Sequence, residues 1–110
     1  MFLSKRKGYR VERKIRIEME KHGWKVVRAG ASLGETDLIC IKNRKCVLLQ
    51  VKSTKKKTFH YYDYSKKTLQ EFPFYLVVDF GYKRIRVMHP TKRVRMDTGM
   101  SWQEFMKKIN

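Results

Sequence analysis

Two apolar runs separated by only two residues constrain the fold of this chain more than any other feature. Asp37 to Lys42 and Lys45 to Lys52 are both rich in Ile, Val and Leu, a composition typical of buried β-strands. The dipeptide Asn43-Arg44 lies between them, and Asn tolerates the positive φ that a two-residue hairpin turn needs. The sequence therefore predicts a β-hairpin with an even loop length.

The even loop length groups three polar residues of this hairpin. Counting back from the turn places Asp37 opposite Gln50, with both side chains on one face of the sheet. Lys52 follows on the same face because side chains alternate along a strand. A three-residue loop would pair Asp37 with Val51 instead, so the grouping depends on the predicted register.

A carboxylate at the head of a buried strand has two explanations. Burying a carboxylate is unfavourable unless it is paired or bound to a cation. The first explanation is a salt bridge between Asp37 and Lys52. The second is a divalent metal held by Asp37, the Gln50 side-chain carbonyl and the Val51 backbone, with Lys52 stabilising charge on a phosphate. The spacing alone favours neither.

The amino-terminal segment can supply a further carboxylate. Apolar residues repeat every four positions from Val11 to Met19 and predict a helix over residues 4–22. Glu12 and Glu18 flank opposite edges of this apolar stripe, and periodicity does not choose between them. Two carboxylates and a lysine beside a basic surface are the groups needed for metal-assisted phosphodiester hydrolysis.

The remaining pattern predicts a sheet flanked by helices. The segment 101–104 fits a helix capping box, Ser-x-x-Glu. The other expected elements are a strand over 24–28, a short helix over 65–72 capped by Ser65 and ended by Pro73, strands over 74–80 and 83–88, and a helix over 101–109. This order, with no repeat and no linker, predicts one domain over residues 1–110 with an α/β or α+β architecture around a mixed sheet.

Charge indicates the partner. The chain has 27 Lys and Arg against 10 Asp and Glu, a formal net charge of +17. Such an excess repels itself unless something anionic lies against it, which predicts nucleic-acid binding. Basic residues cluster near the amino terminus and after the predicted hairpin, and we expect these clusters to contact DNA through Lys5, Arg6, Lys7, Arg10, Arg13, Lys55, Lys56 and Lys57. A non-catalytic, basic DNA-binding protein fits the same charge.

Several other classes are excluded. No uncharged run approaches the ~18 apolar residues of a membrane span, and the amino terminus lacks a secretion-signal pattern. Cys40 and Cys46 are too few for a four-cysteine zinc site and are expected to be reduced. We therefore expect an intracellular protein, of the cytoplasm, nucleoid or an infected host cell, with no membrane partner and no small-molecule cofactor.

Four segments resemble the archaeal-type Holliday junction resolvases, a branch of the PD-(D/E)xK nuclease superfamily. They are residues 7–13, 23–32, 37–39 and 49–53, and the similarity extends over roughly residues 7–88 in the same order. The resemblance implies an α/β fold with a restriction-endonuclease-like core, a central mixed β-sheet of about five strands and flanking helices. It also implies a single nuclease domain that forms homodimers and uses Mg²⁺, with Mn²⁺ as a substitute, to nick four-way DNA junctions symmetrically.

The same resemblance assigns roles to individual residues. Glu12, Asp37 and Lys52 map onto catalytic positions, and Ser32 maps onto a loop serine that affects cleavage. Gln50 stands where most relatives have Glu, which leaves a carbonyl oxygen but removes one negative charge. The implied metal ligands are Glu12, Asp37, Gln50 and Val51. Arg28 and Ser32 are expected to contact DNA beside this site.

The sequence also bears on the dimer interface, on the role of an aromatic cluster and on an alternative activity. The segment 61–88 is the expected dimer interface because it carries more apolar residues than one small sheet needs. The aromatic residues Phe59, Tyr61, Tyr62 and Tyr64 could stack on unpaired bases, although packing is favoured. A restriction- or repair-type nuclease acting on linear duplex is the nearest alternative activity.

Overall fold

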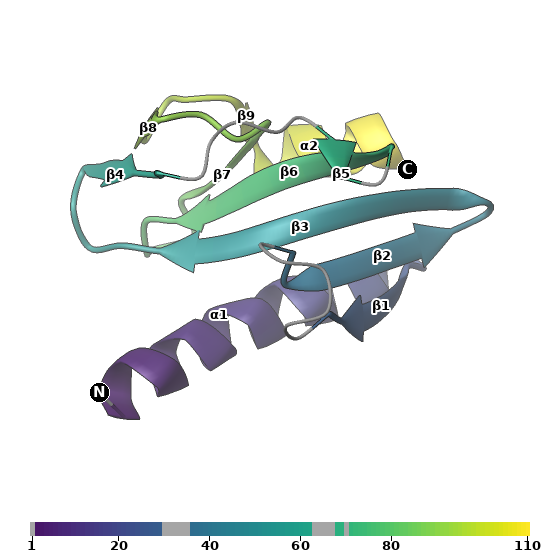
Figure 1. The fold of residues 1–110 in the computed structure, drawn as a ribbon, viewed down its shortest axis with the longest axis horizontal. Coiled ribbons are helices and arrows are strands. Elements are labelled where there is room, and N and C mark those ends of the chain that lie inside the picture. Colours follow the sequence, from purple (N-terminus) through teal and green to yellow (C-terminus); the bar gives the residue numbers. More distant parts are fainter. Residues whose placement is uncertain (1, 30–35, 63–67, 70) are drawn as a thin grey trace.

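A mixed β-sheet forms the centre of the molecule, with two helices on one of its faces (Figure 1). The computed structural model describes residues 2–29, 36–62, 68–69 and 71–110, with side chains for 9–29, 36–62 and 71–110. Ser32, Tyr64 and the expected cap Ser65 lie outside the described residues. The α/β class is confirmed.

The sheet contains seven strands rather than the five expected. Its main path has the order β1-β2-β3-β6-β7-β9, and β5 pairs with β6 beside that path. Only β3 and β6 pair in parallel among these described strands. The strands are β1 (Lys25–Arg28), β2 (Leu38–Lys42), β3 (Lys45–Ser53), β5 (Thr68–Leu69), β6 (Phe72–Asp79), β7 (Ile85–Met88) and β9 (Met100–Ser101).

The β2–β3 hairpin has the predicted register. Asn43 and Arg44 have φ values of 48° and 68°, as a two-residue turn with left-handed backbone at both positions requires. Lys42 pairs with Lys45, and the ladder continues to Leu38 opposite Leu49. The even loop length is therefore confirmed.

Helices α1 (Phe2–Lys21) and α2 (Trp102–Ile109) cover the same face of the sheet. Helix α1 contacts β1, β2 and β3, whereas α2 contacts β7 and β9. Ile15 and Met19 of α1 and Phe105 of α2 are fully buried in one apolar cluster with sheet residues. None of the described helices is long and apolar enough to cross a membrane.

A two-stranded ribbon covers part of the other face. It consists of β4 (Thr58–His60) and β8 (Arg93–Arg95), which were not predicted. Tyr61 and Val94 pack there against Leu76 and Val78 of β6. The ribbon covers the part of this face that β6 and β7 form, whereas Val27 of β1 and Ile41 of β2 are each 44% exposed. Tyr61 is a packing residue, while Tyr62 is 82% exposed.

The helix predicted over residues 65–72 is wrong in its described part. Residues 68–69 form strand β5, and Phe72 and Pro73 begin β6, opposite β5. Proline disfavours the helical region for the residue before it, so Phe72 is extended. Pro73 lies near the start of β6, where a missing N–H is tolerated. The fold thus has two described helices instead of the three expected.

The capping box at the carboxyl-terminal helix is confirmed. The Glu104 N–H donates to Ser101 Oγ at 3.1 Å, and the Ser101 N–H donates to Glu104 Oε1 at 2.9 Å. These reciprocal bonds satisfy two backbone donors that no helical carbonyl can reach. The local signal was therefore sufficient to set where α2 begins.

Candidate active site

The β2–β3 ladder is interrupted at Asp37. In the register of this hairpin, a regular ladder would have the Val51 N–H donate to the carbonyl of Thr36. Instead the Val51 N–H donates to Asp37 Oδ2 at 2.8 Å, and the Asp37 N–H donates to the Leu49 carbonyl at 2.8 Å. The predicted pairing of Asp37 with Gln50 is thus not formed, because strand β2 begins only at Leu38.

Helix α1 brings Glu12 to this interruption. Glu12 Oε1 lies 3.5 Å from Arg28 Nε of β1, and the Arg28 guanidinium lies 5.2 Å from the centre of the Tyr9 ring. Glu18 instead lines an exposed groove of α1, together with Lys21. The structure therefore chooses Glu12 over Glu18, a choice that periodicity left open.

Electrostatics shows that the two carboxylates belong to one cluster. Burial raises the pKa of Glu12, the nearby charge of Asp37 raises it further, and Arg28 and Lys52 lower it. Burial also raises the pKa of Asp37, against the hydrogen bond from Val51 and the charges of Lys52 and Arg28. Glu12, Asp37 and Lys52, from three separate elements, are thus close enough for their charges to interact.

Strand β3 contributes Gln50 and Lys52. They pair with Leu76 and Val78 of β6 and lie on the face away from the helices. Gln50 is 6% exposed, and its Oε1 atom has no hydrogen-bond partner in the structure described. Lys52 is half-buried and makes no hydrogen bond or ion pair with a described residue, so its ammonium group is available to a substrate.

The oxygen donors fit a divalent cation. A buried amide oxygen without a partner is unfavourable, and a hard cation is one way to satisfy it. Glu12 and Asp37 supply carboxylate oxygens in the same cluster, which matches the ligand preference of Mg²⁺. The part of the chain that the structure describes holds no group of three or more His, Cys, Asp or Glu suited to a metal.

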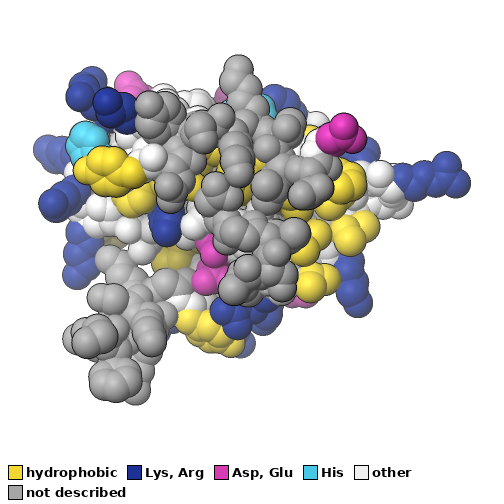
Figure 2. Space-filling view, viewed as in Figure 1, with side chains coloured by type: hydrophobic (Ala, Val, Ile, Leu, Met, Phe, Trp, Pro, Cys, Tyr) yellow, Lys and Arg dark blue, Asp and Glu magenta, His cyan; other side chains and the backbone are white. Residues whose placement is uncertain are grey.

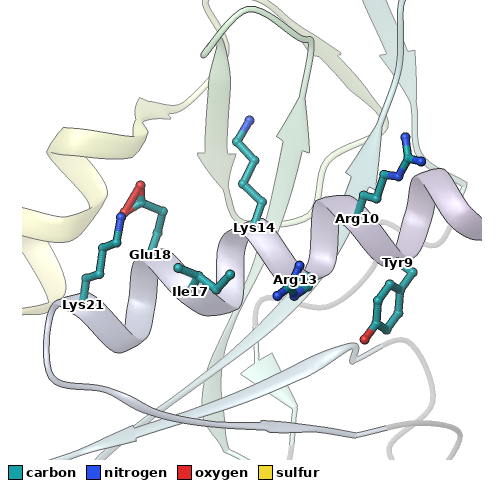
Figure 3. A pocket seen from close by; sticks show the side chains of 7 residues that line it. All are labelled: Tyr9, Arg10, Arg13, Lys14, Ile17, Glu18 and Lys21. Carbon is teal, nitrogen blue, oxygen red and sulfur yellow. The ribbon is translucent and has the colours of Figure 1, made fainter.

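Basic side chains surround the molecule. Lys and Arg stand around most of the outline in Figure 2, whereas Asp and Glu occupy few places. Tyr9, Arg10, Arg13 and Lys14 line an α1 groove of about 430 Å³, with Lys14 and Tyr9 projecting from opposite sides of the helix (Figure 3). Lys55, Lys56 and Lys57 are exposed just after β3, while the side chains of Lys5, Arg6 and Lys7 and the whole of Ser32 lie outside the described residues.

The sequence did not predict an ion pair between α1 and β6. Lys14 Nζ lies 3.1 Å from Asp79 Oδ2 at the end of β6, and the Asp79 carboxylate is buried. Together with Glu12 and Arg28, this pair ties α1 to the sheet on either side of the candidate site. No sequence signal links the two partners, because 65 positions separate them.

Comparison with known proteins identifies the family. The model of the family described as archaeal Holliday junction resolvase (Hjc) matches residues 3–99. The chain belongs to the Hjc family. Among curated proteins, none matches the chain. Membership makes this chain a Holliday junction resolvase of the endonuclease class, and nucleases of this family are generally dependent on a divalent metal.

A solved structure supports the Hjc fold. The chain resembles Archaeoglobus fulgidus Hjc, a Holliday junction resolvase from an archaeal hyperthermophile, with a TM-score of 0.74. The two share 18% sequence identity, and the similarity covers 94% of this chain and 98% of the other. At this identity the likeness concerns the fold, and it supports the expected mixed sheet with flanking helices.

Proposed function

We propose that the chain is a Mg²⁺-dependent crossover junction endodeoxyribonuclease that introduces paired, symmetric nicks in four-way DNA junctions. The observation that carries this proposal is the meeting of Glu12, Asp37 and Lys52 beside an unpartnered Gln50 oxygen in a chain of the Hjc family. A resolvase acts on chromosomal or viral DNA, so we expect it inside a cell.

Glu12, Asp37, the Gln50 side-chain oxygen and the Val51 carbonyl would hold the metal. When bound, the ion supplies Lewis-acid activation of water and charge stabilisation on the phosphate. The Val51 N–H bond fixes one oxygen of Asp37 and thereby orients the carboxylate. Lys52 donates to a phosphate oxygen and stabilises the negative charge that develops during in-line attack.

Arg28 has a second partner available. In the structure it neutralises Glu12, and the Tyr9 ring supports its guanidinium group. Arginine binds phosphate bidentately, so the approach of the DNA backbone offers it a new anionic partner. We infer that Arg28 contacts the backbone beside the cut site, together with Ser32.

The basic residues hold the junction arms through their phosphates. Contacts to phosphates carry no base information, which suits an enzyme that recognises branched shape. The α1 residues Arg10 and Arg13 are exposed on the groove side of the helix, and the lysines 55–57 follow directly after Lys52. Lys5, Arg6 and Lys7 extend the same helix toward its amino terminus.

We infer that the active protein is a homodimer. A four-way junction has approximate two-fold symmetry, so a C2 dimer can place one site on each of two opposing strands. The apolar excess of residues 61–88 is a weaker argument than the sequence indicated, because Leu76, Val78 and Met88 are buried within one chain. Light scattering with and without junction DNA tests the dimer, and a monomer in both conditions contradicts it.

Cleavage of a synthetic four-way junction tests the function, with cut positions mapped on all four strands. We expect symmetric nicks that require Mg²⁺ and far slower cleavage of a linear duplex with the same arm sequences. Equal cleavage of both substrates would indicate a duplex nuclease. Salt-sensitive binding without cleavage in Mg²⁺ or Mn²⁺ would indicate a non-catalytic DNA-binding protein.

A further inference from the structure

A pocket of about 520 Å³ opens where the parallel strands β3 and β6 end, and none of the proposed catalytic groups lines it. Its volume falls within the range of small-ligand sites, ~300–1,000 Å³. The lining residues are Val11, Ser53, Thr54, Lys55, Asp79, Phe80, Gly81 and Tyr82. The pocket thus combines apolar and aromatic surface with hydroxyl groups, the Lys55 cation and the Asp79 carboxylate.

The pocket adjoins the candidate active site through the chain itself. Val11 directly precedes Glu12, and Ser53 directly follows Lys52. Because Ser53 ends the strand that carries Lys52, and Thr54 and Lys55 continue from it, a DNA strand with a phosphate at the site can run toward this pocket. Because the pocket residues continue the segments that carry the site, the ligand that best fits this pocket is a nucleotide of the DNA substrate.

The walls of the pocket are held by bonds to Asp79. The Gly81 N–H donates to Asp79 Oδ1 at 2.7 Å, and the Thr54 N–H donates to the Asp79 carbonyl at 3.0 Å. Lys14 Nζ, 3.1 Å from Asp79 Oδ2, compensates the carboxylate charge. Lys55, which is exposed, leaves the rim attractive to phosphate.

Tyr82 is the most exposed large hydrophobic residue in the described part of the chain. Its side chain is 99% exposed, and its backbone has a φ of 49°, a left-handed conformation that Gly or Asn adopts more easily. Tyr82 and Lys83, with φ values of 49° and 65°, are the central residues of the turn that the Arg84 N–H closes by donating to the Gly81 carbonyl at 2.9 Å, so the turn explains this backbone conformation but not the exposed ring. An exposed aromatic ring beside a cation provides a surface on which a base stacks.

We propose that this pocket binds one unstacked nucleotide next to the scissile phosphate, with its base on the Tyr82 ring and its phosphate at Lys55. The proposal rests on the proposed function for its DNA substrate. It adds a site at which the branch point is recognised, because extruding a base costs less where continuous duplex stacking is broken than inside a linear duplex.

Photocrosslinking tests the contact without requiring cleavage. A four-way junction carrying 5-iododeoxyuridine at successive positions around its centre is irradiated with Asp37→Asn protein, and adducts are mapped by mass spectrometry. We expect an adduct on Tyr82 that Tyr82→Asn removes. Tyr82→Asn should lower junction affinity on the order of tenfold, whereas Tyr82→Phe should retain it.

The variants separate stacking from folding. Asn suits the left-handed backbone, so Tyr82→Asn should unfold at the same or a higher temperature than the wild-type protein. Tyr62→Asn removes the other strongly exposed described tyrosine and serves as the aromatic control. Adducts only on Tyr62, or unchanged affinity in Tyr82→Asn, overturn the pocket proposal and leave junction cleavage unaffected. A Tyr82 adduct in a protein that cuts duplex and junction equally would overturn junction selectivity and retain the pocket.

Discussion

At the scale of single residues, Asp37 combines a structural and a chemical role. Its carboxylate replaces a main-chain carbonyl as acceptor for the Val51 N–H, yet burial raises its pKa above the ordinary value. The charged form is therefore less favourable in the folded protein than in the unfolded chain, despite the charges of Lys52 and Arg28. A bound cation would offset the cost of burying the Asp37 carboxylate.

The first prediction concerns Asp37→Asn. This variant should retain junction binding and lose nicking, since the amide lacks the charge that holds the metal. A carboxyl whose folded-state pKa is raised makes stability fall as pH rises from its ordinary pKa of 3.8 through the raised value. Without metal, Asp37→Asn should therefore have the higher Tm at neutral pH.

The pH series supplies the control. Below pH 3.8 the wild-type carboxyl is neutral in both states, so the difference in Tm should shrink. Added Mg²⁺ should raise the Tm of the wild-type protein and leave that of Asp37→Asn unchanged. Normal nicking by this variant would refute the assignment of the site.

Gln50 provides a second prediction at this scale. Gln50→Leu removes a buried oxygen without a partner and should increase the metal-free stability by about 1 kcal/mol while abolishing nicking. Gln50→Glu should lower the Mg²⁺ concentration for half-maximal cleavage because it adds a negative ligand. Urea unfolding and Mg²⁺ titration measure the two effects, and exposed Gln103→Leu is the matched control. A loss of stability in Gln50→Leu would contradict the account.

At the scale of elements, the sequence was sufficient where a local signal fits only one structure. The Asn43-Arg44 turn and the Ser101–Glu104 capping box depend on neighbours a few positions apart, and both are confirmed. The helix over 65–72 was wrong because Pro73 resembles a helix stop and equally suits the start of a strand. The β4–β8 pairing joins segments about 35 positions apart, so no local pattern announces it.

The candidate site shows the same division. The hairpin grouped the Asp37, Gln50 and Lys52 segments, but the interruption of the ladder depends on a side-chain bond that register counting cannot include. The choice of Glu12 required the docking angle of α1, which an apolar stripe does not specify. Lys14 and Asp79 meet only in the folded protein.

Comparing substitutions at two glycines, Gly99 and Gly81, tests how closely the turn before β9 approaches β7. Gly99 has a φ of +70°, and an added Cβ would lie 2.4 Å from the Val87 carbonyl oxygen, whereas Gly81 has a φ of +90° with nothing within 4 Å. Gly81→Ala should cost about 1–2 kcal/mol from backbone strain alone. Gly99→Ala should cost about 2–5 kcal/mol, since overpacking adds to the strain. Urea unfolding compares them, and equal losses would contradict the close approach of β7 and the turn before β9.

At the scale of the whole molecule, the apolar residues lie in the interior and the basic residues lie at the surface. The helices cover one face of the sheet and the ribbon covers part of the other, so the buried apolar residues form two clusters, and Figure 2 shows Lys and Arg at the surface. A formal net charge of +17 then surrounds a site that contains carboxylates. The surface attracts the DNA backbone, while the site itself needs a cation before a phosphate can approach.

Salt dependence measures this surface. If about six phosphates are contacted, junction affinity should fall on the order of a thousandfold between 50 and 200 mM salt. Removing one exposed contact with Lys56→Ala should reduce the salt slope by about one and weaken all DNA shapes alike. Fluorescence anisotropy at several salt concentrations gives both values. A flat salt response would exclude phosphate contacts as the main source of affinity.

The single parallel pairing among the described strands has a consequence for synthesis. Lys52 lies in β3, but β3 is completed only when β6 aligns beside it, and β6 ends at Asp79. A chain still emerging from the ribosome therefore carries every proposed catalytic side chain well before it can arrange them. We therefore expect a nascent chain to gain nicking activity only after translation has passed the end of β6.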